Sequence, residues 1–178
     1  LGRPVGRYIT LTATDSTFDM YSDSFRERAE VIAKAIGELC GGCERFLAVG
    51  LGNYALTSDA VGPLTAEKIF ATRHIKSLAK ELDTDDLGEV TVIQTGVLGN
   101  TGIESSEQVK AIAERVRPQA VIAVDALACS ELSNLGRTIQ LCDTGISPGS
   151  GVENARKELS LSTLGVKCIA IGVPTVID

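Results

Sequence analysis

The sequence predicts a three-layer α/β/α sandwich around a mostly parallel central sheet. Two observations support this prediction. Short apolar runs alternate along the chain with segments in which apolar residues recur every three or four positions, the spacing of one helix face. Residues 120–124 are apolar throughout, which is typical of a strand covered on both faces. Repeated strand–helix units of this kind favour parallel strands with helices on both sides of the sheet.

The first half of the chain alternates strand and helix patterns. Residues 7–14 alternate polar and apolar positions, as an edge strand does. Ser24 and Glu27 form a capping-box pair, and residues 25–39 then show the helical period until Gly41 and Gly42 end it. Further strands are expected at residues 46–49 and 90–94, with a helix that has Pro63 in its first turn and another over residues 71–82.

The second half continues the same alternation. Ser105 and Gln108 resemble another helix cap, followed by an apolar stripe over residues 109–116 that ends before Pro118. Strands are predicted at residues 120–124, 138–142 and 168–171.

Length and composition indicate one globular domain. The chain has 178 residues, of which 44% are hydrophobic and 22% charged. A chain of this length buries about 68–70% of its unfolded surface in one core. We therefore expect residues 1–178 to form a single core domain.

Several classes of partner and location are excluded or disfavoured. The net charge of -6 argues against a nucleic-acid surface, and 4% aromatic residues without Trp argue against base stacking. No apolar run reaches the roughly 18 residues of a membrane-spanning helix. The five cysteines are odd in number and mostly lie in or beside apolar segments, which favours buried thiols in a reducing compartment.

Two aspartates are the main candidates for catalysis. In parallel sheets, sites form at the carboxyl ends of strands. Asp59 lies in the loop after residues 46–49, and Asp125 directly follows residues 120–124. A carboxylate among apolar residues is costly unless it is paired or protonated. The alternative is that Asp125 caps a helix starting at Ala126 and that Asp59 caps the turn before Pro63.

If the two carboxylates converge, they would share one proton, because two like charges a few ångströms apart cannot both ionise cheaply. The ionised member can then take a proton from water while the protonated member polarises a carbonyl. This arrangement predicts peptide hydrolysis without a nucleophilic side chain.

Other residues are weaker candidates for substrate contacts. Asp143 opens an Asp-Thr-Gly triplet like that of pepsin-like proteases, but those are all-β proteins with two copies, and a turn after a strand also explains it. Glu104 lies in a loop after the predicted strand at residues 90–94. The backbone N–H groups of a loop can line an oxyanion site or a substrate groove. The further candidates on these grounds are Asn53, Gly149, Ser150 and Gly151.

Nucleotide, thiol and metal chemistry have weaker signals. Residues 50–55 fit a G-x-G-x-x-A fingerprint, but a long segment separates it from the next helix, and no acid follows the second strand. The single histidine, His74, lies mid-helix, so every Ser-His or Cys-His mechanism depends on it. Cys40 and Cys43 form a lone C-x-x-C, which is half a zinc site at most.

Several ordered sequence blocks resemble the germination protease, or spore protease, family of endospore-forming bacteria. The blocks cover nearly the whole chain: residues 50–53, 57–63, 72–74, 101–104, 121–128, 143–152, 156–159 and 170–176. The resemblance implies an atypical aspartic endopeptidase that degrades small acid-soluble spore proteins in the cytoplasm of the spore core. It places the two essential aspartates on Asp59 and Asp125. It also implies a zymogen that forms a homotetramer, and a chain truncated at both ends relative to the family.

A more distant resemblance is to hydrogenase maturation endopeptidases, in which two acids and a histidine hold nickel. The corresponding residues here are Asp59, Asp125 and Gly149. Since the imidazole is missing, we expect neither a metal nor another cofactor. The competing predictions are a metal-assisted peptidase, an inactive scaffold with the same fold, and a nucleotide-binding domain.

Overall fold

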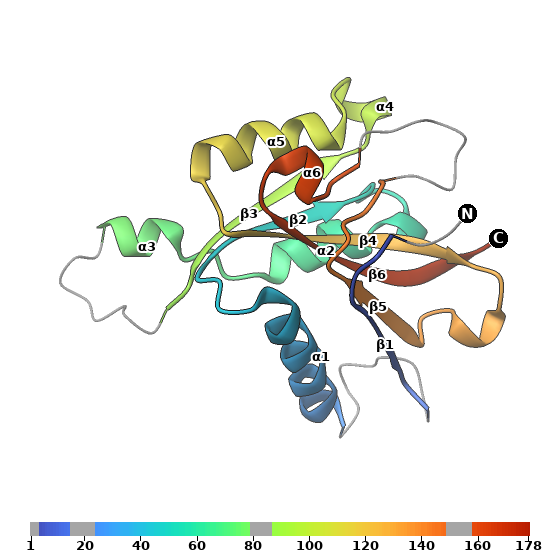
Figure 1. The fold of residues 1–178 in the computed structure, drawn as a ribbon. Coiled ribbons are helices and arrows are strands. Elements are labelled where there is room, and N and C mark those ends of the chain that lie inside the picture. Colours follow the sequence, from blue (N-terminus) through green and yellow to red (C-terminus); the bar gives the residue numbers. More distant parts are fainter. Residues whose placement is uncertain (1–3, 15–23, 79–86, 149–157) are drawn as a thin grey trace.

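A six-stranded mixed sheet forms the centre of the computed structural model, which describes residues 4–14, 24–78, 87–148 and 158–178 (Figure 1). The strand order is β1-β5-β6-β4-β2-β3. The strands are β1 (Tyr8–Thr12), β2 (Arg45–Leu51), β3 (Glu89–Gly96), β4 (Ala120–Cys129), β5 (Thr138–Cys142) and β6 (Lys167–Ile177). The helices are α1 (Phe25–Cys40), α2 (Val61–Lys68), α3 (Arg73–Leu78), α4 (Leu98–Thr101), α5 (Ser105–Val116) and α6 (Leu161–Leu164), with short 3-10 helices η1 (Thr57–Asp59) and η2 (Leu132–Asn134).

Four of the strands run in one direction. β6, β4, β2 and β3 are parallel neighbours, whereas β5 runs antiparallel to β6, and β1 runs antiparallel to β5. The carboxyl ends of β2, β3, β4 and β6 therefore meet at one edge of the sheet. The sandwich with a mostly parallel sheet is confirmed, and β1 is the edge strand that the alternating pattern predicts.

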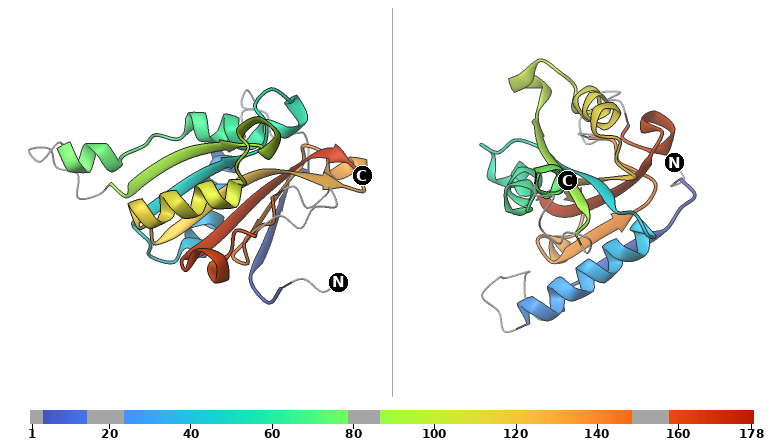
Figure 2. Two further views of the ribbon diagram at one scale, coloured as in Figure 1. Left: turned by 90° about the horizontal axis from the view of Figure 1, so that it is seen from above. Right: turned by 90° about the vertical axis from the view of Figure 1, so that its left-hand side faces the viewer.

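Helices cover both faces of the sheet (Figure 2). On one face, α1 packs Ala35 and Leu39 against Ala120, Val124 and neighbouring strand residues. On the other face, α5 packs Val109 and Ala113 against alternate positions of β2 and β4. α2 lies on the same face as α1, where Gly62 contacts Gly50 of β2. Each face thus has its own apolar core, as the continuous apolar strands predict.

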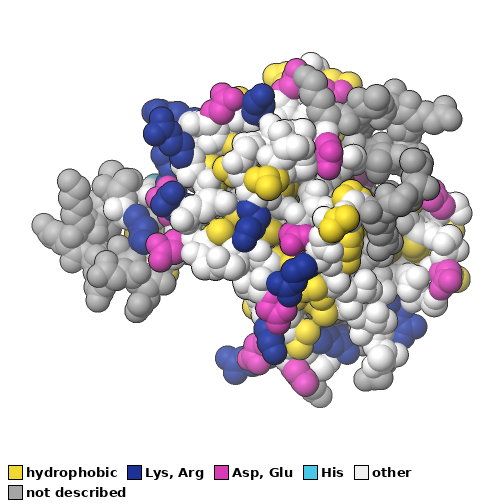
Figure 3. Space-filling view, viewed as in Figure 1, with side chains coloured by type: hydrophobic (Ala, Val, Ile, Leu, Met, Phe, Trp, Pro, Cys, Tyr) yellow, Lys and Arg dark blue, Asp and Glu magenta, His cyan; other side chains and the backbone are white. Residues whose placement is uncertain are grey.

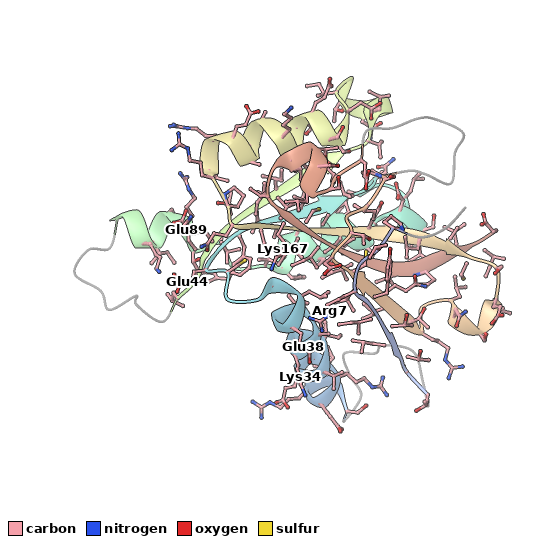
Figure 4. All side chains as sticks on the ribbon, in the orientation of Figure 1. Arg7, Lys34, Glu38, Glu44, Glu89 and Lys167 are labelled. Carbon is pink, nitrogen blue, oxygen red and sulfur yellow. The ribbon has the colours of Figure 1, made fainter. Side chains whose placement is uncertain are left out.

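The amino-terminal part is held by α1 and polar contacts near its end. Gly41 closes α1 in the left-handed conformation, with φ of 56°. The ammonium group of Lys167 donates to the main-chain oxygen of Cys40 at 3.0 Å, and Arg7 forms a 3.2 Å ion pair with Glu38 (Figure 4). On the described part of the face in Figure 3, side chains of both charges are interspersed.

Three local predictions are corrected. The strand predicted at residues 120–124 continues to Cys129, so no helix begins at Ala126 and Asp125 is not a helix cap. α5 is capped by Glu104, whose partner in the capping box is Glu107, instead of by Ser105 with Gln108. The side chain of Ser24 makes no capping hydrogen bond to α1.

Two further findings concern the helices. The helix predicted over residues 71–82 begins at Arg73 instead of residue 71 and is described as far as Leu78, and residues 79–82 lie outside the described part of the chain. Among the described residues, no helix combines the length and apolarity needed to cross a membrane.

Candidate functional site

The sheet opens between β2 and β4 at their carboxyl ends. The parallel pairing of these strands stops at Gly50 and Val124. β2 continues beside β3, with a register shift after Gly50 that pairs Leu51 with Gly96. β4 continues beside β6, from Asp125 opposite Gly172 to Cys129 opposite Ile177. The two strands therefore leave a crevice at the place where sites form in open α/β sheets.

Glycines allow the chain to leave β2 at this point. Gly52 has φ of 110°, a conformation that favours glycine, and a Cβ there would clash with the main-chain oxygen of Asp59. Gly62 packs so closely that a Cβ would clash with the main-chain oxygens of Leu51 and Val124. The loop after β2 and the first turn of α2 therefore pack closely against the ends of β2 and β4.

Asp59 is fixed within this loop. It is the last residue of η1, and its side chain is half-buried. Its Oδ2 accepts a hydrogen bond from the backbone N–H of Asn53 at 2.7 Å. Asn53 in turn accepts from the backbone N–H of Ala55 through its side-chain oxygen at 3.0 Å. The carboxylate therefore has one anchored oxygen.

Asp125 is a buried acid within a strand. Asp125 is only 7% exposed, although it lines the crevice. Its Oδ1 accepts a hydrogen bond from the backbone N–H of Ala126 at 2.9 Å. The position of Asp125, one residue beyond the last pairing with β2, places it where the two strands separate.

Both acids line one open cleft of about 730 Å³. Asn53 and Glu104 line it as well, so the structure brings four of the predicted site residues together. The other lining residues are Leu51, Gly52, Leu56, Ser58, Gly96, Val97, Leu98, Ser105, Ala126, Leu127, Ala128, Ile146, Ser147, Pro148, Val176 and Asp178. A cleft of this size falls within the range of roughly 300–1,000 Å³ that is common for ligand sites.

Glu104 has a second contact that explains its position. Its side chain accepts from the N–H of Glu107, and the side chain of Glu107 accepts from the N–H of Glu104 at 3.3 Å. Ser105, next in sequence, donates to the main-chain oxygen of Gly96 at 3.3 Å. These bonds attach the amino end of α5 to the end of β3 at the cleft.

Asp143 lies elsewhere. It is not among the residues that line the cleft, and its Oδ1 accepts from the backbone N–H of Arg7 at 2.7 Å. The following Gly145, with φ of 90°, has no space for a Cβ beside Leu159. Gly149, Ser150 and Gly151 lie outside the described residues. The substrate contacts assigned to these residues stay predictions.

The thiols and the histidine also lie away from the cleft. His74 is on α3, and neither histidine nor cysteine lines the cleft. Cys43 donates its thiol to the main-chain oxygen of Cys40 at 3.0 Å, and all five cysteines are free. Burial raises the pKa of Cys168 to about 12, with smaller contributions from Cys142 and Glu158.

Sequence analysis missed the apolar lining of the cleft. Leu56, Leu98 and Val176 are 55%, 38% and 42% exposed, respectively. Residues 126–128 also line the cleft as part of β4, whereas the predicted strand ends at residue 124. The apolar run, which resumes directly after Asp125, is the sequence signal that could have extended the predicted strand to residues 126–128.

The sequence matches the germination protease family over residues 1–178. The chain belongs to the germination protease family. It is 41% identical over 181 residues to a germination protease of Clostridium perfringens, with 100% of this chain and 55% of that protein aligned. It is 45% identical over 180 residues to one of Caldanaerobacter subterraneus subsp. tengcongensis, covering 100% of this chain and 55% of that protein. The chain thus spans about half the length of these curated relatives.

A solved structure shares the fold. A NiFe hydrogenase maturation protease from Thermococcus kodakarensis KOD1 superposes with a TM-score of 0.51 and 22% identity, over 79% of this chain and 80% of that one. The resemblance to germination proteases is therefore confirmed, and that to hydrogenase maturation proteases is confirmed for the fold.

The donor atoms of the cleft do not fit nickel. The ionisable residues that line it are Asp59, Glu104, Asp125 and Asp178, which offer oxygen donors alone. Imidazole nitrogen is a suitable ligand for nickel in proteins, and the cleft offers none. Within the described ranges, no group of three or more His, Cys, Asp and Glu side chains is arranged to hold a metal ion.

Proposed function

We propose that the protein is an endopeptidase that begins the degradation of small acid-soluble spore proteins, with Asp59 and Asp125 as a carboxylate pair that activates water. The observation that carries this proposal is the single open cleft lined by both acids. Membership of the germination protease family supports a peptidase, and the resemblance described above supplies the substrate class. Assembly as a homotetramer and location in the spore core stay predictions from that resemblance.

In the proposed reaction, the ionised carboxylate accepts a proton from water as the water oxygen attacks the carbonyl carbon of the scissile peptide bond. The protonated carboxyl group donates to the carbonyl oxygen, on which negative charge develops. The carboxyl group that took the proton from water passes it to the leaving nitrogen as the C–N bond breaks, and the second carboxylate regains its proton as the carbonyl re-forms.

The test is cleavage of a purified small acid-soluble spore protein by the wild type and by Asp59→Asn and Asp125→Asn. An amide cannot accept the proton, so each variant is expected to lose about 10²–10⁴-fold in kcat/KM. Glu38→Gln, on an exposed ion pair away from the cleft, is the control and should cleave normally. Thermal unfolding of every variant separates lost chemistry from lost folding.

Three results would contradict the proposal. Full activity of either cleft variant would remove that aspartate from the mechanism. Activity that disappears with a chelator and returns with a divalent ion would replace the carboxylate mechanism with a metal-assisted one. A folded wild type that cleaves nothing would favour the inactive scaffold.

A further inference from the structure

The cleft exposes one edge of a strand. From Asp125 to Cys129, β4 pairs with β6 on one side, while its pairing with β2 has ended at Val124. No other described strand pairs with this part of β4. Asp125, Ala126, Leu127 and Ala128 all line the cleft. An unpaired edge of this kind presents main-chain N–H and C=O groups to any extended chain that reaches it.

One hydrogen bond indicates which backbone groups point into the cleft. In a strand, successive residues direct their N–H and C=O groups to opposite sides. The N–H of Asp178, next to the end of β6, donates to the main-chain oxygen of Cys129 at 3.0 Å, so Cys129 faces β6. Ala126 and Ala128 therefore share the open side. The register shift after Leu127 leaves the extra residue, Thr175, on β6, so the alternation along β4 is kept.

The position of this edge matches the chemistry proposed for the cleft. Asp125 is the first residue of the open edge, and the loop that carries Asp59 borders the same cleft. Leu56, Leu98 and Val176 add exposed apolar side chains to the walls. An extended peptide bonded to residues 126–128 would thus pass both acids while apolar surfaces receive its side chains.

We propose that the substrate binds by strand addition, as an extended segment that pairs with the open edge of β4 at residues 126–128 and occupies the place that β2 leaves. The inference rests on the proposed peptidase function and specifies how that site takes its substrate. Main-chain pairing supplies affinity that depends little on sequence, and the apolar walls supply side-chain preference. The ligand is therefore an unfolded or extended polypeptide segment.

The first test measures binding apart from cleavage. Overlapping peptides that tile a small acid-soluble spore protein are labelled, and their binding to the Asp59→Asn variant is followed by fluorescence anisotropy. The tightest peptide is then methylated at one backbone nitrogen at a time. A methylated nitrogen cannot donate a hydrogen bond and its methyl group adds a clash, so affinity should fall at least about tenfold at alternate positions only.

The second test reads the protein side of the same bonds. Ala128→Pro removes the N–H at the open edge and should bind the peptide about tenfold more weakly than Ala128→Val, which enlarges the same side chain but keeps the N–H. Should Ala128→Pro fold poorly, amide hydrogen exchange of the Asp59→Asn variant gives the answer. Peptide binding should slow exchange of the Ala128 amide and leave that of Ala123, inside the sheet, unchanged.

The outcomes separate the two proposals. Losses at every position of the peptide, at none, or in one continuous block would overturn strand addition, as would an unchanged Ala128 amide. Absence of binding by every peptide would overturn it too. If the methylation pattern alternates but the wild type cleaves nothing, the peptidase proposal fails while the mode of binding stands.

Discussion

The backbone N–H of Asn53 donates to the carboxylate of Asp59 at 2.7 Å, six residues further along the chain. This bond closes the loop that leaves β2 and turns one oxygen of Asp59 toward the chain that bears Asn53. Gly52, the residue before Asn53, lies against Asp59: its φ is 110°, and a Cβ there would clash with the main-chain oxygen of Asp59. The position of the acid therefore depends on a glycine seven residues before it.

Replacing Gly52 should displace Asp59 while leaving its carboxylate group chemically unchanged. In Gly52→Ala, the new Cβ meets the main chain of Asp59 in a left-handed conformation, so the loop must move. We expect a loss of more than about 2 kcal/mol in unfolding free energy and a fall in kcat/KM. Urea unfolding and the cleavage assay measure the two effects.

Gly102→Ala is the matched control. Gly102 has φ of 68°, but no heavy atom lies within 4 Å of a Cβ built there. It should lose about 1 kcal/mol through backbone strain alone and keep its cleavage rate. Equal effects of the two substitutions on cleavage would contradict the claim that contact with Asp59 matters.

A stabilising change is predicted on α1. Gly37 lies inside this helix, is exposed, and has no heavy atom within 4 Å of a built Cβ. Gly37→Ala should raise the unfolding free energy by about 0.5–1 kcal/mol, because alanine loses less backbone entropy in a helix. A higher midpoint in urea with an unchanged m-value would support this. A lower midpoint would show that α1 needs the flexibility or close packing of glycine at this position.

Stability should fall in alkaline solution because of Cys168. Burial raises its pKa from 9.0 to about 12 in the folded protein. Above pH 9.0 the unfolded thiol ionises while the folded one does not, so the unfolded state is favoured increasingly up to pH 12. The contribution of the protonated thiol is complete below pH 9.0 and is lost at about 1.4 kcal/mol per pH unit above it.

Comparison with Cys168→Ala isolates this effect. The variant lacks the thiol, so its unfolding free energy should fall less steeply with pH than that of the wild type, since Lys and Tyr titrate in both. Urea unfolding over the alkaline range measures the difference in slope. Parallel pH profiles for the two proteins would show that the thiol does not ionise differently on unfolding.

The sequence predicted the meeting of Asp59 and Asp125 at one edge because both follow strands of a parallel sheet. Asp143 also follows a predicted strand, at residues 138–142, but β5 runs antiparallel to β6, so its carboxyl end lies at the opposite edge of the sheet. In the structure, residues 130–137 between β4 and β5 are too few for a parallel crossover of a dozen or more residues, but the predicted strand ended at residue 124, and the longer connection that this left did not reveal the direction of β5. The separation of β2 from β4 was beyond sequence reasoning, because it depends on tertiary contacts of Gly50, Gly52 and Gly62.

The last prediction concerns the amino end of β6, at the end of the parallel strands opposite the cleft. The ammonium group of Lys167 donates to the main-chain oxygens of Cys40 at 3.0 Å and Leu39 at 3.4 Å, where the carbonyls of α1 lack helical partners. Lys167→Met should lower the unfolding free energy by about 1 kcal/mol through loss of these bonds and of the favourable charge at the helix end. Cleavage should be unchanged, because Lys167 is not among the residues that line the cleft.

Lys34→Met on the same helix provides the comparison. Lys34 is exposed on α1, whereas Lys167 comes from β6; both are labelled in Figure 4. This substitution should change the unfolding free energy by no more than about 0.5 kcal/mol.

Burial raises the pKa of Cys40, Cys43 raises it further, and Lys167 lowers it. Alkylation of Cys40 in native Lys167→Met should therefore require a higher pH than in Lys34→Met, and equal pH profiles would show that the ammonium group does not act on this thiol.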